Sequence, residues 1–171
     1  ILNVNNKIDK YMNGYYEFPL DELTKFESEK SKRKMEDKDD YEVPNLKFRD
    51  LNVMDDGSVF ISCEEFHIRH NASSPGVKGN LYTWYYDNII AAKINASGQL
   101  EWVRKIPKKQ KTISAEGIYS KGNPFKGTMG FKLVSNLNGY YFLYMDNKKN
   151  LGLKDNEVPQ LHLDDYGGQV M

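Results

Sequence analysis

This chain of 171 residues contains a single cysteine, Cys63. An internal disulfide is therefore excluded. Charge of one sign is missing too: 24 Lys and Arg residues balance 24 Asp and Glu residues. Such a balance provides no overall field that would gather nucleic acid or an anionic membrane. No apolar run approaches the roughly 18 residues of a membrane-spanning helix. We therefore expect no nucleic-acid partner and no transmembrane segment, and we interpret Cys63 as a small buried residue.

Several motifs that carry chemistry are also missing. The sequence contains no glycine-rich loop for phosphate, no Gly-x-Ser-x-Gly nucleophile motif and no Cys/His set with zinc spacing. We expect no cofactor. The sequence has no signal peptide, but it opens on Ile1 rather than methionine, which indicates a processed or trimmed start.

Tyrosine is abundant where tryptophan is scarce, with 12 Tyr against 2 Trp. Tyrosine provides apolar area with a polar tip, which suits sheets that have one wet face. Successive side chains of a strand point to opposite faces of its sheet. The segment 58–63 therefore predicts an inward face with Val59, Ile61 and Cys63, and an opposite face with Ser58, Phe60 and Ser62. The composition and alternation predict a mainly β protein.

The β pattern is repeated within the chain. Residues 51–61 read as strand, Asp-Gly turn and strand, and residues 132–142 repeat this pattern with an Asn-Gly turn. A second turn pattern follows each copy, at 94–100 and 163–170. The repeat predicts antiparallel sheets built from about two four-strand units.

We expect one β-rich domain over residues 1–171. Its parts are an N-terminal strand and helix segment (1–44), a first repeat unit (45–107), a connecting loop (107–127) and a second unit (128–171). Short strands are expected at 1–4 and 15–18. Leu20, Leu23 and Phe26 follow helical spacing, and acidic residues precede a long charged stretch, so one helix is expected over about 20–36.

The four-strand pattern supports a resemblance. The segment NIIAAKINASGQLEW at 88–102, together with DGSVFI at 56–61, resembles uncharacterised exported proteins of Bacteroidota-type bacteria with β-propeller-like blade repeats. The resemblance covers about 45–171. It implies blade-like units, an exported location (periplasmic, cell-surface or secreted) and contact with further repeats of a parent chain. Because a closed propeller needs about four or more blades, a single β-sandwich or an open barrel is the alternative architecture.

An aromatic run is the first candidate binding site. Tyr82, Trp84, Tyr85 and Tyr86 stand beside an Asn/Ser/Gly-rich insertion at 67–80, and flat aromatic faces stack on sugar rings and peptide side chains. A carbohydrate or a protein would be the partner. In a strand, Tyr85 faces away from the other three residues, so core or edge packing is the alternative interpretation.

A charged strand end is the second candidate. Glu65 and His67 share one face of the strand and are a possible pair of metal ligands, but no third ligand accompanies them in the local sequence. The alternative is a solvated strand end in which Glu65, continuing the inward face, is partly buried and paired.

Paired acids are the third candidate. The pairs at 55–56 and 164–165 could serve glycosidase chemistry, but both occupy expected turns, where Asp binds nearby backbone amides. The sequence therefore predicts a non-enzymatic, exported binding or scaffolding module. A hydrolase acting on glycans or peptides and a structural piece of a larger propeller are the alternatives. An enzyme should bring two acids or a histidine into one cleft, whereas a binding module should expose an aromatic strip.

Overall fold

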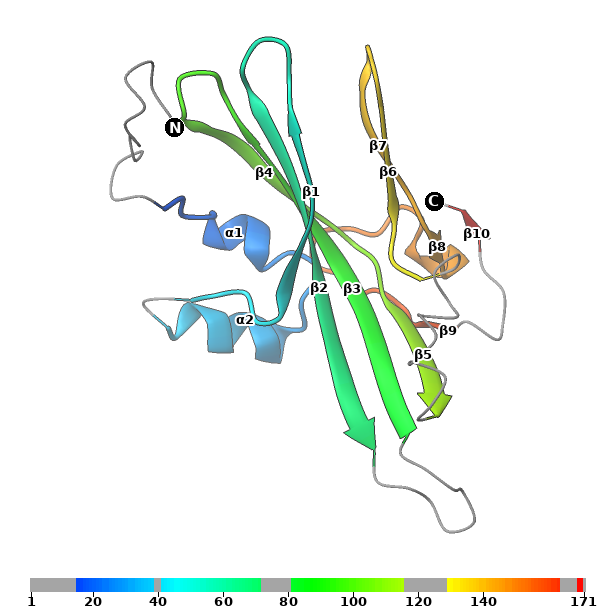
Figure 1. The fold of residues 1–171 in the computed structure, drawn as a ribbon. Helices are drawn as coiled ribbons and strands as arrows, with labels where there is room; N and C mark the ends of the chain where they lie inside the picture. The colour runs from blue at the N-terminus through cyan, green and yellow to red at the C-terminus, as the bar shows by residue number, and fades with distance from the viewer. Residues whose placement is uncertain (1–14, 39–40, 72–80, 116–128, 164–168, 171) are drawn as a thin grey trace.

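The protein is mainly β, as expected (Figure 1). The computed structural model describes residues 15–38, 41–71, 81–115, 129–163 and 169–170. The expected strand at 1–4, most of the 67–80 insertion and the acid pair at 164–165 lie outside these ranges. No helix in the described ranges is long and apolar enough to cross a membrane.

Six strands form the main sheet. They are β1 (Leu46–Val53), β2 (Val59–Asn71), β3 (Leu81–Ile94), β4 (Leu100–Ile106), β5 (Gln110–Ala115) and β9 (His162–Leu163). All neighbours pair antiparallel except β5 and β9, which are parallel. The long strand β3 organises the sheet, because β2 pairs along one of its edges while β4 and then β5 pair along the other.

Two helices replace the single helix expected over 20–36. α1 (Leu20–Leu23) ends before Phe26, whose backbone has a φ of 63° and whose N–H donates to the Asp155 carbonyl at 2.8 Å. α2 (Glu29–Glu36) then begins behind Ser28, which accepts from the Ser31 N–H as an N-cap. The single-helix prediction was wrong because the buried Phe26 turns out of the helical path. Residues 15–18, expected as a strand, are irregular.

Both helices cover one face of the sheet (Figure 1). Leu23 and Met35 from the helices pack with a cluster from the strands, consisting of Cys63, Ile90, Ala92 and Val103. The inward position of Cys63 is therefore confirmed, and burial raises the pKa of its thiol. Ile61 packs against the same cluster, as its alternation with Cys63 predicted.

The opposite face is covered as well. A hairpin of β6 (Lys132–Asn136) and β7 (Gly139–Leu143) lies on that side (Figure 1). Phe60, only 1% exposed, stacks on Tyr140 with ring centroids 3.7 Å apart. Ser58 and Ser62 are equally buried. The expectation of one wet face was therefore wrong for β2, because the hairpin, distant in sequence, covers its second face.

The two expected repeat units differ in the structure. β1 to β4 form four consecutive antiparallel strands over the first unit. The second unit is divided: β6 and β7 form their own sheet, β8 (Met145–Asp146) pairs β10 (Gln169–Val170), and β9 joins β5. A short 3₁₀ helix, η2 (Lys148–Asn150), follows β8. Blade units are not confirmed, and the described strands close no barrel.

The segment 107–127, expected as a loop, contains β5. The sequence pattern stops at Pro107, but the ladder on β3 resumes at Gln110, which pairs with Tyr86. A bridge of three residues, 107–109, thus separates two strands that run along the same edge of β3. This bridge lines a cavity on the helix-covered side of the sheet.

Candidate functional site

Irregularities in neighbouring strand pairs meet in the middle of the main sheet. In the β2–β3 pair, Glu65 lies opposite two residues, Asp87 and Asn88, because Glu64 pairs with Ile89 and Phe66 with Tyr86. On the other edge of β3, the same two residues lie opposite the 107–109 bridge. β-bulges re-aim side chains and interrupt pairing. Polar side chains consequently gather in a part of the sheet where uninterrupted strands would place apolar ones.

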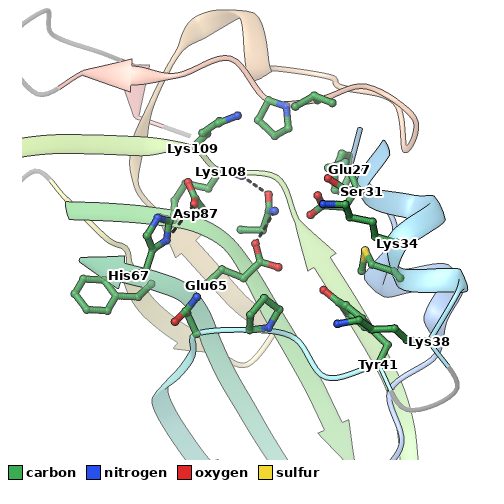
Figure 2. Close-up of a pocket in the computed structure, with 18 of the residues that line it drawn as sticks. Glu27, Ser31, Lys34, Lys38, Tyr41, Glu65, His67, Asp87, Lys108 and Lys109 are labelled. Atoms are coloured by element: carbon green, nitrogen blue, oxygen red, sulfur yellow. Dashed lines mark hydrogen bonds and ion pairs between the residues drawn. The ribbon is translucent and has the colours of Figure 1, made fainter. Parts of the chain in front are cut away.

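A cavity of about 720 Å³ opens between this part of the sheet and the helical segment; we call it the central pocket (Figure 2). Its charged lining comes from both sides. The sheet provides Glu65, His67 and Asp87, the bridge provides Lys108 and Lys109, and the helical segment provides Glu27, Lys34, Asp37 and Lys38. Figure 2 shows Lys34 and Lys38 across the pocket from Glu65 and Asp87.

Glu65 is fully engaged by the protein. Its Oε1 lies 3.3 Å from Lys105 Nζ, and its Oε2 accepts from Asn88 Nδ2 at 2.9 Å. Lys105 also contacts Glu27 Oε1 at 2.7 Å and donates to the Leu23 carbonyl at 2.8 Å. Burial raises the pKa of Glu65, and the charge of Lys105 opposes that rise. The predicted pairing of a partly buried Glu65 is therefore confirmed.

Asp87 is only partly engaged. Its Oδ2 lies 4.0 Å from His67 Nδ1, while its Oδ1 is buried and has no hydrogen-bond partner in the described part of the chain. Burial, followed by the negative charge of Glu65, raises the pKa of Asp87 from 3.8 to about 6, against the opposing charges of Lys108 and Lys109. Asp87 therefore offers a hydrogen-bonding atom that the described protein leaves unused.

His67 stands beside Asp87 and is held by an aromatic ring. It stacks on Tyr85 with centroids 4.3 Å apart and an interplanar angle of 8°. Partial burial lowers the pKa of His67 below its ordinary 6.5. The imidazole is therefore mostly neutral at pH 7, and the positive charge facing Asp87 comes from lysines instead.

A buried ion pair lies beneath the pocket. Lys108 Nζ contacts Glu64 Oε1 at 2.7 Å, and both side chains are fully buried. Lys108 also donates to the Tyr86 carbonyl at 2.8 Å and to Gln110 Oε1 at 3.2 Å, while Arg49 binds the other Glu64 oxygen. Burial lowers the pKa of Lys108, and Glu64 opposes that shift. These contacts hold the bridge against the sheet and position the pocket wall.

The register divides the aromatic run between two faces, as alternation predicted. Tyr82, Trp84 and Tyr86 lie opposite His70, Ile68 and Phe66, whereas Tyr85 lies opposite His67. Phe66 contacts the rings of Trp84 and Tyr86 with centroids 5.8 and 4.9 Å away, and Tyr86 is buried. The four residues do not form one platform. Tyr85 stacks on His67, and Trp84 and Tyr86 contact Phe66; both His67 and Phe66 line the central pocket.

The remaining candidates from the sequence are the possible metal ligands Glu65 and His67 and the acid pair at 55–56. Among the residues that the structure describes, no group of three or more His, Cys, Asp or Glu side chains is placed to hold a metal, so Glu65 and His67 gain no third ligand. Asp56 has the expected turn role: its Oδ1 accepts from the Ser58 N–H at 2.8 Å, and hydrogen bonds from Ser58 lower its pKa.

Sequence reasoning missed the pocket positions of Asp87, of Lys34 in α2 and Lys38 just after it, and of the buried Lys108. One signal was available, since the polar pair Asp87-Asn88 interrupts an apolar strand between Tyr86 and Ile89. The bridge Pro107-Lys108-Lys109 similarly separates two strand patterns. Polar residues at interior strand positions, matched by an interruption in the neighbouring strand, indicate a bulge beside a break between strands.

Comparison with known proteins assigns no family, because no protein-family model, no curated protein and no solved structure matches the chain.

Proposed function

We propose that the chain is a binding module whose central pocket holds a small polar ligand. The observation that carries this proposal is the buried Oδ1 of Asp87, which has no hydrogen-bond partner in the described part of the chain. A buried polar atom without a partner costs about 1–3 kcal/mol. The Asp87 side chain as a whole is 23% exposed and lines the pocket, so a ligand that donates to its carboxylate would add a hydrogen bond where the described chain provides only the 4.0 Å contact with His67.

The surroundings of Asp87 support a binding role. A volume of about 720 Å³ lies within the usual range of small-ligand sites, roughly 300–1,000 Å³. Phe26, Met35 and Val158 provide apolar lining beside the polar groups. Glu65, engaged through both oxygens, and Lys108, engaged through its ion pair, hold the sheet side of the pocket in place. A preformed site loses less entropy on binding.

A thermal-shift screen against amino acids, sugars, nucleosides and organic acids tests this proposal. A ligand at about 100 times its Kd stabilises a fold by about 2.7 kcal/mol, which corresponds to a Tm rise of roughly 5–10 °C for a chain of this size. We expect at least one class to raise the Tm, and Asp87→Asn to reduce the shift. The control Asp55→Asn, in an exposed turn, should respond as the unmodified protein does. A shift that survives Asp87→Asn unchanged would contradict the role of Asp87.

A hydrolase is the second candidate, favoured by a specific arrangement. Asp87, with a pKa of about 6, shares the pocket with a second carboxylate, Glu65, and with the imidazole of His67. Acid–base catalysis uses groups that titrate near the working pH. Chromogenic glycosides and peptide anilides are the assay substrates, and turnover that Asp87→Asn abolishes would favour this candidate over simple binding.

Export and repeat architecture complete the proposal. The resemblance at 88–102 favours an exported protein, and the four consecutive strands over 45–107 favour a blade-like first unit that could contact further repeats. Carbohydrate and protein fragments are the proposed ligand sources. If the chain is instead a structural piece of a larger propeller, its central pocket should bind no ligand.

A further inference from the structure

A second cavity lies on the face of the main sheet opposite to the helices. It has a volume of about 500 Å³ and is lined by residues of β3, β4 and β7, including Ala91, Trp102 and Tyr140; we call it the hairpin groove. Strand β7 belongs to the hairpin that lies on that side of the sheet (Figure 1). The hairpin groove shares no lining residue with the central pocket and is a separate site.

The register of the main sheet explains why this face is hollow. Ser62 pairs with Ala91, and Ala91 pairs with Arg104, so the three residues form one row across the sheet. The neighbouring positions on the same face of β4 have larger side chains, Trp102 and Ile106. The short side chain of Ala91 therefore lies at the base of a groove whose walls are longer side chains.

The hairpin provides the second wall of the groove. Tyr140 and Phe142 stand two residues apart on β7, so they share one face of that strand, and both line the groove. Tyr140 stacks on Phe60 with centroids 3.7 Å apart, and Phe142 packs edge-on against Phe131 with centroids 5.4 Å apart. These contacts hold the rings in place before a ligand arrives. Aromatic walls of this kind favour a flat aromatic ring.

Arg104 gives the groove a positive charge. Its side chain is 63% exposed, and its Nη1 donates to the Val103 carbonyl at 2.8 Å. Glu22 Oε2 lies 3.9 Å from Nη1, and Lys25 contacts the same oxygen at 2.9 Å. In the described part of the chain, Nε and Nη2 of Arg104 have no hydrogen-bond partner, and no acidic residue lines the groove. A guanidinium with free N–H groups fits a carboxylate.

We propose that the hairpin groove binds a small aromatic carboxylate, with its ring against Trp102, Tyr140 and Phe142 and its carboxylate on Arg104. Trp102 and Arg104 lie two residues apart on one face of β4, about 7 Å along the strand, which suits a ring with a short acidic side chain. A sugar acid would also match the charge, but its hydroxyl groups need several hydrogen-bond partners, and the lining is mostly apolar. This second site goes beyond the binding role proposed for the central pocket.

Nuclear magnetic resonance of the ¹⁵N-labelled full chain tests this proposal with four probes: phenylacetate, phenylacetamide, cyclohexylacetate and glucuronate. Phenylacetate should shift the indole N–H signal of Trp102 and the amide signals of residues 102–106 and 139–142. Phenylacetamide lacks the charge and should bind about threefold to tenfold more weakly, the range for a carboxylate on a partly exposed arginine. Cyclohexylacetate keeps the charge without the aromatic ring and should also bind more weakly, and glucuronate should cause no shift.

A charge variant assigns the carboxylate end. Arg104→Gln should remove the preference for phenylacetate over phenylacetamide, and the exposure of Arg104 makes loss of folding an unexpected result. Arg69→Gln removes an exposed arginine outside the groove and is the matched control, which should retain that preference.

The outcomes are independent of the role proposed for the central pocket, which the amides of residues 65–67 and 86–88 report. Equal binding of phenylacetate and phenylacetamide, or a preference that survives Arg104→Gln, would overturn the role of Arg104 and with it the proposal. Tighter binding of glucuronate or cyclohexylacetate would overturn the aromatic ligand class. If phenylacetate shifts only signals outside the hairpin groove, or shifts none, the groove is not the site proposed.

Discussion

Lys108→Met should lower the free energy of unfolding by about 3 kcal/mol, because it removes one of the two cations that contact the buried Glu64 and leaves Glu64 Oε1 without its ion-pair partner. Glu64 is fully buried and would keep only Arg49 as its partner. The Tyr86 carbonyl and Gln110 Oε1 would also lose a donor. Denaturant unfolding followed by circular dichroism measures the change.

A surface ion pair provides the matched control for this substitution. Lys93 contacts Glu101 at 2.9 Å on the exposed part of the sheet, and Lys93→Met should change stability much less than Lys108→Met does. The double variant Lys108→Met with Glu64→Gln should be more stable than the sum of its single variants predicts. Equal effects at positions 108 and 93 would show that the buried pair does not hold the bridge.

Phe60→Ala should destabilise the protein by about 3–5 kcal/mol, the usual cost of truncating a buried phenylalanine. Phe60 stacks on Tyr140 and contacts Trp102 edge-on, with centroids 6.1 Å apart. An isolated two-stranded hairpin is marginally stable. We therefore expect the amides of β6 and β7 to lose protection from hydrogen exchange before the main sheet does.

Phe48→Ala is the control for this prediction. Phe48 is 55% exposed on the neighbouring strand β1, so its truncation should cost much less than that of Phe60. If both substitutions cost the same, or if the β6–β7 amides remain protected in Phe60→Ala, the hairpin does not depend on the contact with β2.

The sequence predicted the strands of the first unit because their alternation is local. Val59, Ile61 and Cys63 share a face in any regular strand, and the structure confirms the inward position of Ile61 and Cys63. The burial of Phe60 could not be predicted from this pattern, because it depends on Tyr140, which lies 80 residues later. The division of the helix at Phe26 is similarly non-local, since its N–H binds the carbonyl of Asp155.

The central pocket could be predicted only in part. The sequence singled out Glu65 and His67 because they stand in a dense polar stretch, and both line the pocket. It gave no weight to Asp87, which the sequence places beside an aromatic run. The bulge in the β2–β3 pair brings Asp87 to the pocket, and α2 approaches the pocket from more than 45 residues earlier in the chain. The strand register and the position of α2 both depend on contacts between residues that are distant in the sequence.

Asp87 has the properties of a residue kept for function at a cost to the fold. Its carboxylate is partly buried and close to a second carboxylate, and one of its oxygens has no hydrogen-bond partner in the described part of the chain. Because the folded pKa of about 6 lies above the ordinary 3.8, the folded state binds this proton more tightly than the unfolded chain does. The resulting stabilisation is fully present below about pH 3.8 and is lost as the pH rises through 6.

The free energy of unfolding of Asp87→Asn relative to the unmodified protein, measured from pH 4 to pH 8, tests this account most directly. Asparagine keeps the shape of the side chain without the charge, so the variant should gain about 2 kcal/mol relative to the unmodified protein over this range and then level off. At pH 8 the variant should be the more stable protein. A variant that is less stable at pH 8 would show that Asp87 has a structural partner, and a difference that does not change with pH would show that its pKa is not raised. Either result would contradict the account.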